Sequence, residues 1–354
     1  MICGNEEDLI VRCLDSARPL IDELCLVRAV GTLKPDLSGL MARDWAVGNH
    51  IPFQFEAYLN EIPLPHVDDF SAARNLSFSL ATSDWILWLD CDDLLSPEAC
   101  AAIRACAEEN AHDCYQFMYT KPDGSTCPRE RLIRRGAGRW KNRVHETCLI
   151  ASGDMCLVPE IVIQHARDDV HRQSSHERNL TLLGLALDDA PRHYFYLHEE
   201  LFWKWDQTRN DPKTLDHAVR TGEAALILIG DAKPDDIYEI LLNLYDLQPS
   251  RIELLQRAET LQPQRREALA YRCQRELRDK RLLEAVAWFK KMDALPVPEP
   301  PPWTHRSIWY GSGWARNYLR VKLLRAVGRD AEADADHAVY LASPAYAKAW
   351  EKEG

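Results

Sequence analysis

The stretch that decides the fold reads DWILWLDCDD over residues 84–93. The apolar residues 85–89 show no alternation, which predicts a central strand covered on both faces. Asp90, Asp92 and Asp93 would then lie at the carboxyl end of that strand, where open α/β sheets bind ligands. Three carboxylates so close together repel one another unless a cation lies among them. The pattern therefore predicts a site for a divalent cation with oxygen ligands, which in turn holds a phosphate.

A second interpretation of the same acids is the start of a helix. Residues 96–98 read SPE, which is the chemistry of an N-cap, a first helical position and a first-turn acid. The two interpretations are compatible, because a strand can end in a ligand site and lead into a capped helix. Asp93 stays open between a metal ligand and a cap.

Three further segments stand in a fixed order around this cluster. Residues 1–7 read MICGNEE, residues 69–75 read DFSAARN and residues 139–146 read RWKNRVHE. Together with the acid cluster they resemble the inverting family 2 glycosyltransferases of the GT-A fold, over roughly the first half of the chain. The resemblance implies an α/β GT-A domain with a Rossmann-like mixed sheet, and a nucleotide-diphospho sugar as donor.

The resemblance also implies the residues of the site. Those expected to contact the nucleotide sugar are Cys3, Asn5, Glu6, Arg74, Asn75, Asp90, Trp140 and Arg143. Those expected to hold a divalent metal, Mn²⁺ or Mg²⁺, are Asp92, Asp90 and His165. An inverting transferase needs a base for the acceptor hydroxyl, and the candidates are Glu146 and His145. The structural alternatives are a solvated Arg74, an ion-paired Glu146, and core positions for Trp140 and His165.

The chain departs from the family pattern near its start. Strand-like residues 24–30 are followed by Gly31-Thr32, where the family commonly has an Asp that contacts the base, and Asp36 comes late. The base is therefore left open, with a UDP-sugar as the expected donor. Only residues 1–3 remain of the first strand, so either the strand is very short or the chain begins inside it. Other expected elements are helices over 6–17 and 97–109, strands over 115–119 and 132–133, and a turn at 122–124.

The composition limits the functional classes. A formal net charge of −12 argues against a broad nucleic-acid surface. A basic patch keeps a nucleic-acid acceptor open without favouring it; it comprises Arg129, Arg131, Arg134, Arg135, Arg139, Lys141 and Arg143. The 11 cysteines are scattered without a Cys-x-x-Cys pair, which indicates reduced thiols in a cytoplasmic protein. No signal peptide and no apolar run long enough for a membrane span are expected. The histidines at 165, 171 and 176 match no zinc spacing.

The second half has a different texture. Long amphipathic segments rich in Ala, Leu, Glu and Arg predict helices over 216–225, 234–245, 266–278 and 282–292. Segments 279–295 and 328–344 resemble tetratricopeptide-like helix pairs, although a proline-rich stretch at 296–302 interrupts the period. Close-packing alanines are expected at 285, 287, 331, 333 and 335. We therefore expect a GT-A domain over 1–170 and an α-helical domain over 171–354, which recognises the acceptor or forms a homodimer.

Three functions are compatible with these observations to different degrees. The first is a metal-dependent, inverting, hexosyltransferase-type glycosyltransferase that acts on an acceptor hydroxyl. The second is a degenerate transferase domain that serves as a helical-repeat interaction scaffold, an alternative favoured by the missing Asp after the second strand. The third, an Asp-x-Asp phosphohydrolase, lacks the Thr that such a motif needs. The acceptor stays open among a glycan, a lipid-linked sugar, a peptide and a modified nucleobase.

Overall fold

The computed structural model describes residues 1–121, 126–166, 172–187, 190–208, 211–230, 233–296, 314–343 and 346–347. The chain divides into two compact units, Met1–Glu200 and Leu201–Gly354. Several expectations lie outside the described residues: the turn at 122–124, His171 and most of the proline-rich stretch at 296–302.

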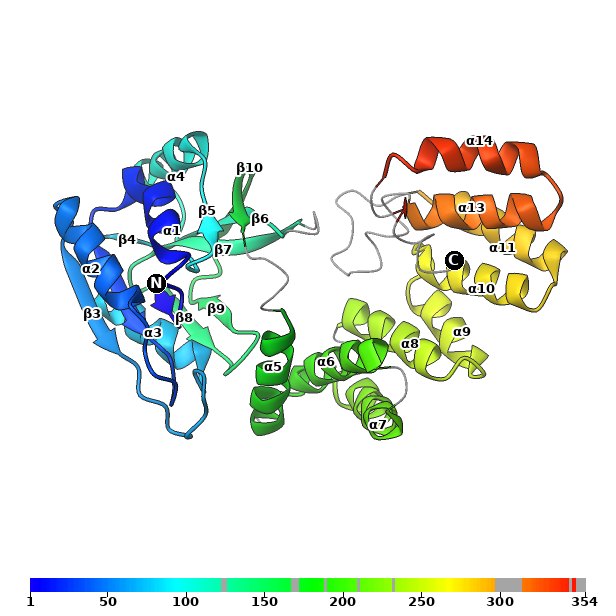
Figure 1. Ribbon diagram of the computed structural model, residues 1–354, viewed down its shortest axis with the longest axis horizontal. Coiled ribbons are helices and arrows are strands. Elements are labelled where there is room, and N and C mark those ends of the chain that lie inside the picture. Colours follow the sequence, from blue (N-terminus) through cyan, green and yellow to red (C-terminus); the bar gives the residue numbers. More distant parts are fainter. Residues whose placement is uncertain are drawn as a thin grey trace. The chain divides into compact units, whose positions relative to one another are not determined.

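The first unit alternates strands and helices (Figure 1). Its elements in chain order are β1 (Ile2–Cys3), α1 (Ile10–Ala17), the 3₁₀ turn η1 (Arg18–Leu20), β2 (Leu24–Arg28), α2 (Ser38–Gly48), β3 (Phe53–Ala57), α3 (Phe70–Leu80), β4 (Trp85–Leu87), β5 (Asp93–Leu94), α4 (Pro97–Glu109), β6 (Cys114–Thr120), β7 (Thr126–Arg134), β8 (Gly138–Lys141), β9 (Thr147–Ile150), β10 (Met155–His165), α5 (Arg172–Ala186) and α6 (Arg192–Thr208). The division between the two units falls within α6.

A parallel sheet with the order β1-β2-β3 forms the amino-terminal half of the first unit. Its middle strand is buried on both faces, as an apolar parallel strand should be. On one face Leu26 packs with Leu14 of α1 and Ala42 of α2. On the other face Val27 packs with Ala73 of α3. The carboxyl ends of β1 and β2 therefore open at one edge between two layers of helices.

A mixed sheet with the order β4-β7-β6-β10-β5 forms the other half. Strands β6 and β10 run parallel, and the remaining neighbours are antiparallel. Helix α4 covers one face, where Ile103 packs with Phe117 and Ile163. The β8–β9 hairpin covers the other face, where Trp140 packs with Trp88. The expected α/β fold with a mixed sheet is confirmed.

The deciding strand differs from its expected form. β4 contains only Trp85–Leu87, its side chains are half-buried, and it lies at one end of the mixed sheet. It pairs with β7 alone. On its other edge a cavity of about 500 Å³ separates it from the start of β2, so no strand covers that side. The expectation of a central strand buried on both faces was therefore wrong.

The helix that follows the acid cluster has the expected bounds. The Ser96 side chain accepts a hydrogen bond from the Ala99 backbone N–H, and Pro97 and Glu98 occupy the first turn. Asp93 is therefore not the cap of α4. In contrast, α1 begins at Ile10 rather than at residue 6. Residues 5–7 instead bond to the segment 34–38, for example through the Glu6 N–H and Ser38 Oγ, 2.8 Å apart.

The second unit is helical throughout its described residues, as expected. Its helices, after the end of α6, are α7 (Pro212–Leu228), α8 (Pro234–Leu247), α9 (Ile252–Leu261), α10 (Glu267–Arg278), α11 (Leu282–Asp293), α13 (Trp314–Ala326) and α14 (Asp330–Tyr340). Helices α10 and α11 are joined by residues 279–281, and α13 and α14 by residues 327–329. Such short connections make each pair antiparallel neighbours (Figure 1).

Only part of the expected alanine packing is present. Ala285 and Ala333 are fully buried, whereas Ala287, Ala331 and Ala335 are exposed. Residues two apart on a helix point in different directions, so one buried alanine places its i±2 neighbours at the surface.

Two further expectations concern the whole chain. All 11 cysteines are free thiols, and most of them are buried, in agreement with reduced, structural cysteines. Within the described part of the chain, no helix combines the length and apolarity that crossing a bilayer requires.

Candidate active site

A cavity of about 380 Å³ opens beside the carboxyl ends of β1 and β2 and the acid cluster after β4. Most of the residues expected at the site line it. They are Cys3, Asn5, Glu6, Arg74, Asp90, Asp92, Trp140, His145, Glu146 and His165. Asn75 and Arg143 do not belong to the lining. The sheet edge therefore gathers five segments that lie far apart in the sequence.

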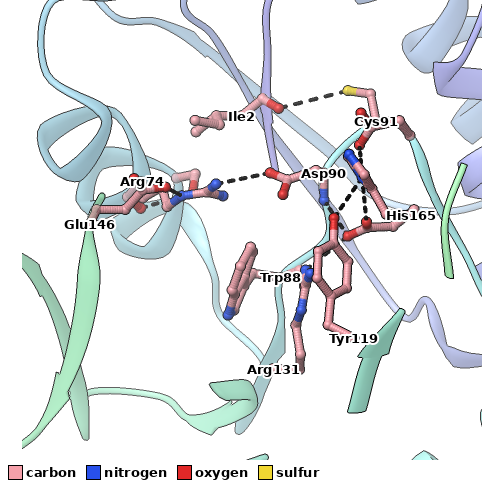
Figure 2. A network of polar contacts seen from close by, with 12 residues as sticks. Ile2, Arg74, Trp88, Asp90, Cys91, Tyr119, Arg131, Glu146 and His165 are labelled. Atoms are coloured by element: carbon pink, nitrogen blue, oxygen red, sulfur yellow. Dashed lines mark hydrogen bonds and ion pairs between the residues drawn. The ribbon is translucent and has the colours of Figure 1, made fainter. Parts of the chain in front are cut away.

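Arg74 of α3 joins two carboxylates across the cavity (Figure 2). Its Nη2 lies 2.9 Å from Asp90 Oδ1, and its Nε lies 2.8 Å from Glu146 Oε1. The guanidinium is buried and lies over the Trp88 ring at 4.5 Å. Burial by itself would raise the pKa of Asp90. The positive charge of Arg74 outweighs that effect, and the pKa of Asp90 falls to about 2. Arg74 is thus a fixed bridge rather than a solvated side chain.

A second group could hold a metal ion. Ligand atoms of Asp92, Asp93 and His165 all lie within 4.8 Å of one another. Asp93 Oδ1 is buried and accepts no hydrogen bond within the described structure, whereas Asp93 Oδ2 is paired with Arg131. One buried carboxylate oxygen is therefore left without a hydrogen bond. Two carboxylates and an imidazole suit Mn²⁺ or Mg²⁺. The donor set therefore fits a divalent cation, with Asp93 in the position expected for Asp90.

His165 lies at the end of β10, beside both acids. Its Nδ1 is 3.3 Å from Asp92 Oδ1 and 3.9 Å from Asp93 Oδ1. The Tyr119 hydroxyl lies 2.6 Å from the same nitrogen, within hydrogen-bond distance. Burial by itself would lower the pKa of His165. The hydrogen bonds and charges of the two carboxylates have the larger effect and raise this pKa to about 9. His165 is therefore part of the polar cluster and not a core histidine.

Arg131 of β7 lies in the same charged cluster, although it was not among the site residues expected from the sequence. Its side chain is 1% exposed, and its Nη1 donates to Asp93 Oδ2 at 2.8 Å. The guanidinium also lies over the Trp88 ring at 3.8 Å, and Arg74 contacts the same ring. The sequence placed Arg131 in a surface patch, because nothing local reveals a partner 38 positions away.

Part of the expected basic patch is neutralised within the protein. Arg131 is buried against Asp93, and Arg134 pairs with Asp113 at 3.0 Å. The Arg135 Nε donates to the Ser83 carbonyl at 3.0 Å. Arg129 lines the cavity, and the described structure shows no carboxylate partner for it. Arg135, Arg139 and Lys141 are exposed, so the patch keeps some surface charge and a nucleic-acid acceptor stays a prediction that is not favoured.

The loop at 142–146, between β8 and β9, carries Glu146 and His145. Asn75 holds the strand before it, since its amide donates to the Trp140 carbonyl and accepts from the Trp140 N–H, both at 2.9 Å. The Arg143 carbonyl accepts from the Phe70 N–H at 2.9 Å. Asn75 and Arg143 thus shape the site from behind instead of facing into the cavity.

The other end of the cavity is formed by β1, β2 and the segment 64–67. Ala29 and Val30 lie where the family has its Asp, with His66 opposite them. The Asn5 side chain accepts from the Asp36 N–H at 3.1 Å and donates to the Lys34 carbonyl at 3.1 Å. Asp36 in turn accepts from the Glu7 N–H. No carboxylate takes the position of the missing Asp among the residues that line this end.

The chain is similar to known proteins over part of its length. Residues 48–160 match the family described as Glycosyl transferase family 2. A TPR repeat-containing protein of Synechococcus elongatus is 31% identical over 209 residues, which cover 54% of this chain and 48% of that protein. The chain therefore spans about half the length of this curated relative.

Solved structures show a weaker likeness. S. aureus TarS gives a TM-score of 0.41 at 11% identity, covering 73% of this chain and 54% of that chain. A TarS fragment in complex with UDP-GlcNAc gives a TM-score of 0.38 at 13% identity, covering 70% of this chain and 87% of that chain. A likeness of this degree establishes neither the mechanism nor the substrate of this chain.

Proposed function

Because residues 48–160 form a family 2 glycosyltransferase domain, we propose that this chain is a metal-dependent, inverting glycosyltransferase. It transfers a sugar from a nucleotide-diphospho sugar to an acceptor hydroxyl. The observation that carries the proposal is the division of charges at the cavity: an Asp92–Asp93–His165 group, in which both acids are buried, beside an Arg74-bridged pair of Asp90 and Glu146.

The residues divide the chemistry between them. Asp92, Asp93 and His165 would hold the divalent cation, which when bound neutralises the charge of the departing diphosphate. Arg74 pairs with both Asp90 and Glu146 and lowers the pKa of Asp90. Glu146 Oε2 forms no hydrogen bond in the described structure and is therefore able to accept the proton of the acceptor hydroxyl. Attack of that hydroxyl from the face opposite the diphosphate inverts the anomeric centre.

A uridine diphosphate sugar is the donor we propose to test first. The apolar end of the cavity, with Ala29, Val30 and His66, would receive the base. The helical second unit is proposed to recognise the acceptor or to form a homodimer. The scaffold alternative retains one supporting observation, the absence of a carboxylate at the end of β2 that lines the cavity.

Thermal denaturation with a panel of nucleotide sugars tests the proposal. Each donor is added with and without Mn²⁺, and specific binding raises the melting temperature by mass action. We expect one nucleotide class to stabilise the protein only when Mn²⁺ is present, and the same donor to be hydrolysed slowly. If no donor raises the melting temperature and none is hydrolysed, the scaffold alternative replaces the enzyme.

A further inference from the structure

We propose that Glu200 is a positioning residue for the loop 142–146, and that it holds the base Glu146 in place through His145. The inference rests on the proposed function in one respect, since it takes Glu146 to be the base. Glu200 itself does not line the cavity. Its effect must therefore pass through the loop.

The loop 142–146 has two non-glycine residues in a strained backbone conformation, which surrounding contacts must stabilise. Lys141 pairs with Thr147 at the ends of β8 and β9, so residues 142–146 make the whole connection. Within it, Asn142 has φ 75° and His145 has φ 51°. A left-handed conformation costs a non-glycine residue about 1 kcal/mol or more and persists only where neighbouring structure imposes it. His145 directly precedes Glu146, so its backbone sets the direction of the base.

Two contacts hold the His145 ring. It stacks on the Tyr196 ring, with centroids 4.1 Å apart and planes 10° from parallel. Its Nε2 is buried and lies 3.6 Å from Glu200 Oε1. Both partners lie on α6, at positions i and i+4, which share one face of a helix. One face of α6 therefore makes both contacts with the His145 imidazole: Tyr196 stacks on the plane of the ring, and Glu200 lies at the edge that carries Nε2.

Glu200 is in turn held by α5. Its Oε1 accepts from the Asn179 amide at 2.7 Å, and its Oε2 is paired with His176 Nδ1. Burial alone would raise the pKa of Glu200, but these contacts and the one with His145 lower it to about 2. The carboxylate is 6% exposed and stays charged. A buried charge with three polar partners is a rigid support, because any movement would leave it uncompensated.

The other contacts of the loop lie on either side of His145. The Arg143 carbonyl accepts from the Phe70 N–H, and Glu146 Oε1 accepts from Arg74. Without Glu200, the side chain of His145 would keep only the Tyr196 stack. The loop could then relax toward an ordinary backbone and turn Glu146 away from the acceptor. The cation group at Asp92, Asp93 and His165 would be unaffected, so the affinity for the donor should be preserved.

The variant Glu200→Gln tests this in the full chain, with Glu177→Gln as the matched control. Glu177 is an exposed residue of α5, and none of its side-chain contacts reaches the site in the described structure. We expect Glu200→Gln to lower kcat about tenfold or more, with the donor dissociation constant from calorimetry unchanged within about twofold. Glu200→Asp should recover part of kcat. Wild-type kcat in Glu200→Gln, or an equal loss in Glu177→Gln, would overturn the proposal.

Hydrogen exchange separates this inference from the proposed function. Backbone amides at 142–147 should exchange faster in Glu200→Gln than in the wild type or Glu177→Gln, while those of β6 and β10 keep their protection. Unchanged exchange of the loop would refute the anchoring whatever the enzyme does. If the wild type binds no donor but the loop 142–146 exchanges faster in Glu200→Gln, then Glu200 does anchor the loop and only the proposed glycosyl transfer is refuted.

Discussion

The carboxylates of the site are distributed between two buried arginines. Arg74 takes Asp90 and Glu146, and Arg131 takes Asp93. Since a buried charge is tolerated only when it is paired, each arginine holds its carboxylate partners in place. Asp92 is left without an arginine, beside His165. A bound cation would give Asp92 the positively charged partner that the other carboxylates obtain from the arginines.

Asp92→Asn should therefore remove metal-dependent donor binding and leave the fold intact. We expect the affinity for a nucleotide sugar with Mn²⁺ to fall by about tenfold or more, because one ligand charge is lost. Relief of the repulsion between neighbouring carboxylates should keep the free energy of unfolding within about 1 kcal/mol of the wild type. Calorimetry and denaturant titration measure the two quantities. Asp84→Asn, at an exposed position before β4, is the control; equal donor affinity in both variants would remove Asp92 from the cation site.

Glu146→Gln should separate transfer from binding. The amide oxygen can still accept the Arg74 hydrogen bond, so the loop keeps its shape, but the side chain can no longer take a proton. We expect kcat for transfer to fall by about 10²-fold or more, with donor affinity unchanged within about twofold. Steady-state kinetics and calorimetry on the same preparation decide it. A variant with wild-type turnover would move the base to His145 or to another carboxylate.

At the scale of residues, the sequence could identify the site residues that belong to a recognisable local motif. The cation-binding role expected of Asp92 rests on acids after an apolar run, whereas that of His165 came from the resemblance to the family. The exchange of Asp90 for Asp93 could not be predicted, because it depends on which arginine reaches which carboxylate. Arg131 approaches Asp93 from a strand 38 positions away, and Glu200 approaches His145 from a later helix.

At the scale of elements, predictability depends on the strength of the local signal. Helix α4 was predicted to its bounds, since Ser96 caps it by a side-chain bond that the sequence itself specifies. Helix α2 and strand β3 were not predicted. β3 is an edge strand that is half exposed, so it lacks a continuous apolar run, and α2 has no side-chain cap. β4 was predicted too long and too buried, because an apolar run does not reveal which edges are paired.

Gly31 holds the base end of the cavity by its conformation. Its φ is +61°, and a Cβ at this position would lie 2.3 Å from the Leu64 carbonyl oxygen and 2.5 Å from that of His66. We expect Gly31→Ala to destabilise the fold by about 2 kcal/mol or more and to displace His66, which weakens donor binding. Gly184→Ala, where nothing lies within 4 Å, should instead stabilise by about 0.5–1 kcal/mol. Denaturant unfolding of both variants compares them; equal stability would contradict the close approach.

Glu200, on the face of α6 that contacts His145, should make the free energy of unfolding depend on pH in the acidic range. Glu200 has a pKa lowered to about 2, whereas the unfolded value is about 4.3. A depressed carboxylate contributes stability above its unfolded pKa and loses it as the pH falls toward its folded pKa. We therefore expect the advantage of the wild type over Glu200→Gln, of roughly 3 kcal/mol at most, to be full above about pH 5 and to shrink between pH 5 and 2. Denaturant titrations across that range measure it, and a constant difference would exclude Glu200 as the titrating group.

At the scale of the whole molecule, the order of an α/β unit followed by helices was predictable from texture alone. The sheet ends at His165, close to the expected boundary at 170, but the first compact unit continues to Glu200. Sequence texture could not show this, since α5 and the start of α6 are as helical as the second unit. Their contacts with the loop 142–146, through Tyr196 and Glu200, tie them to the sheet.

Two truncations test where the transferase module ends. A chain of residues 1–208 keeps α5, all of α6 and the anchor of His145, and should bind the donor with Mn²⁺ within about threefold of the full chain. A chain of residues 1–170 loses that anchor, which comprises the Tyr196 stack and the Glu200 contact of His145, so it should unfold at lower denaturant. If the second unit recognises the acceptor, residues 1–208 should hydrolyse the donor but no longer transfer the sugar. Circular dichroism, calorimetry and a transfer assay compare the chains; full acceptor activity in residues 1–208 would assign recognition to the first unit, and a stable, active chain of residues 1–170 would end the module before α5.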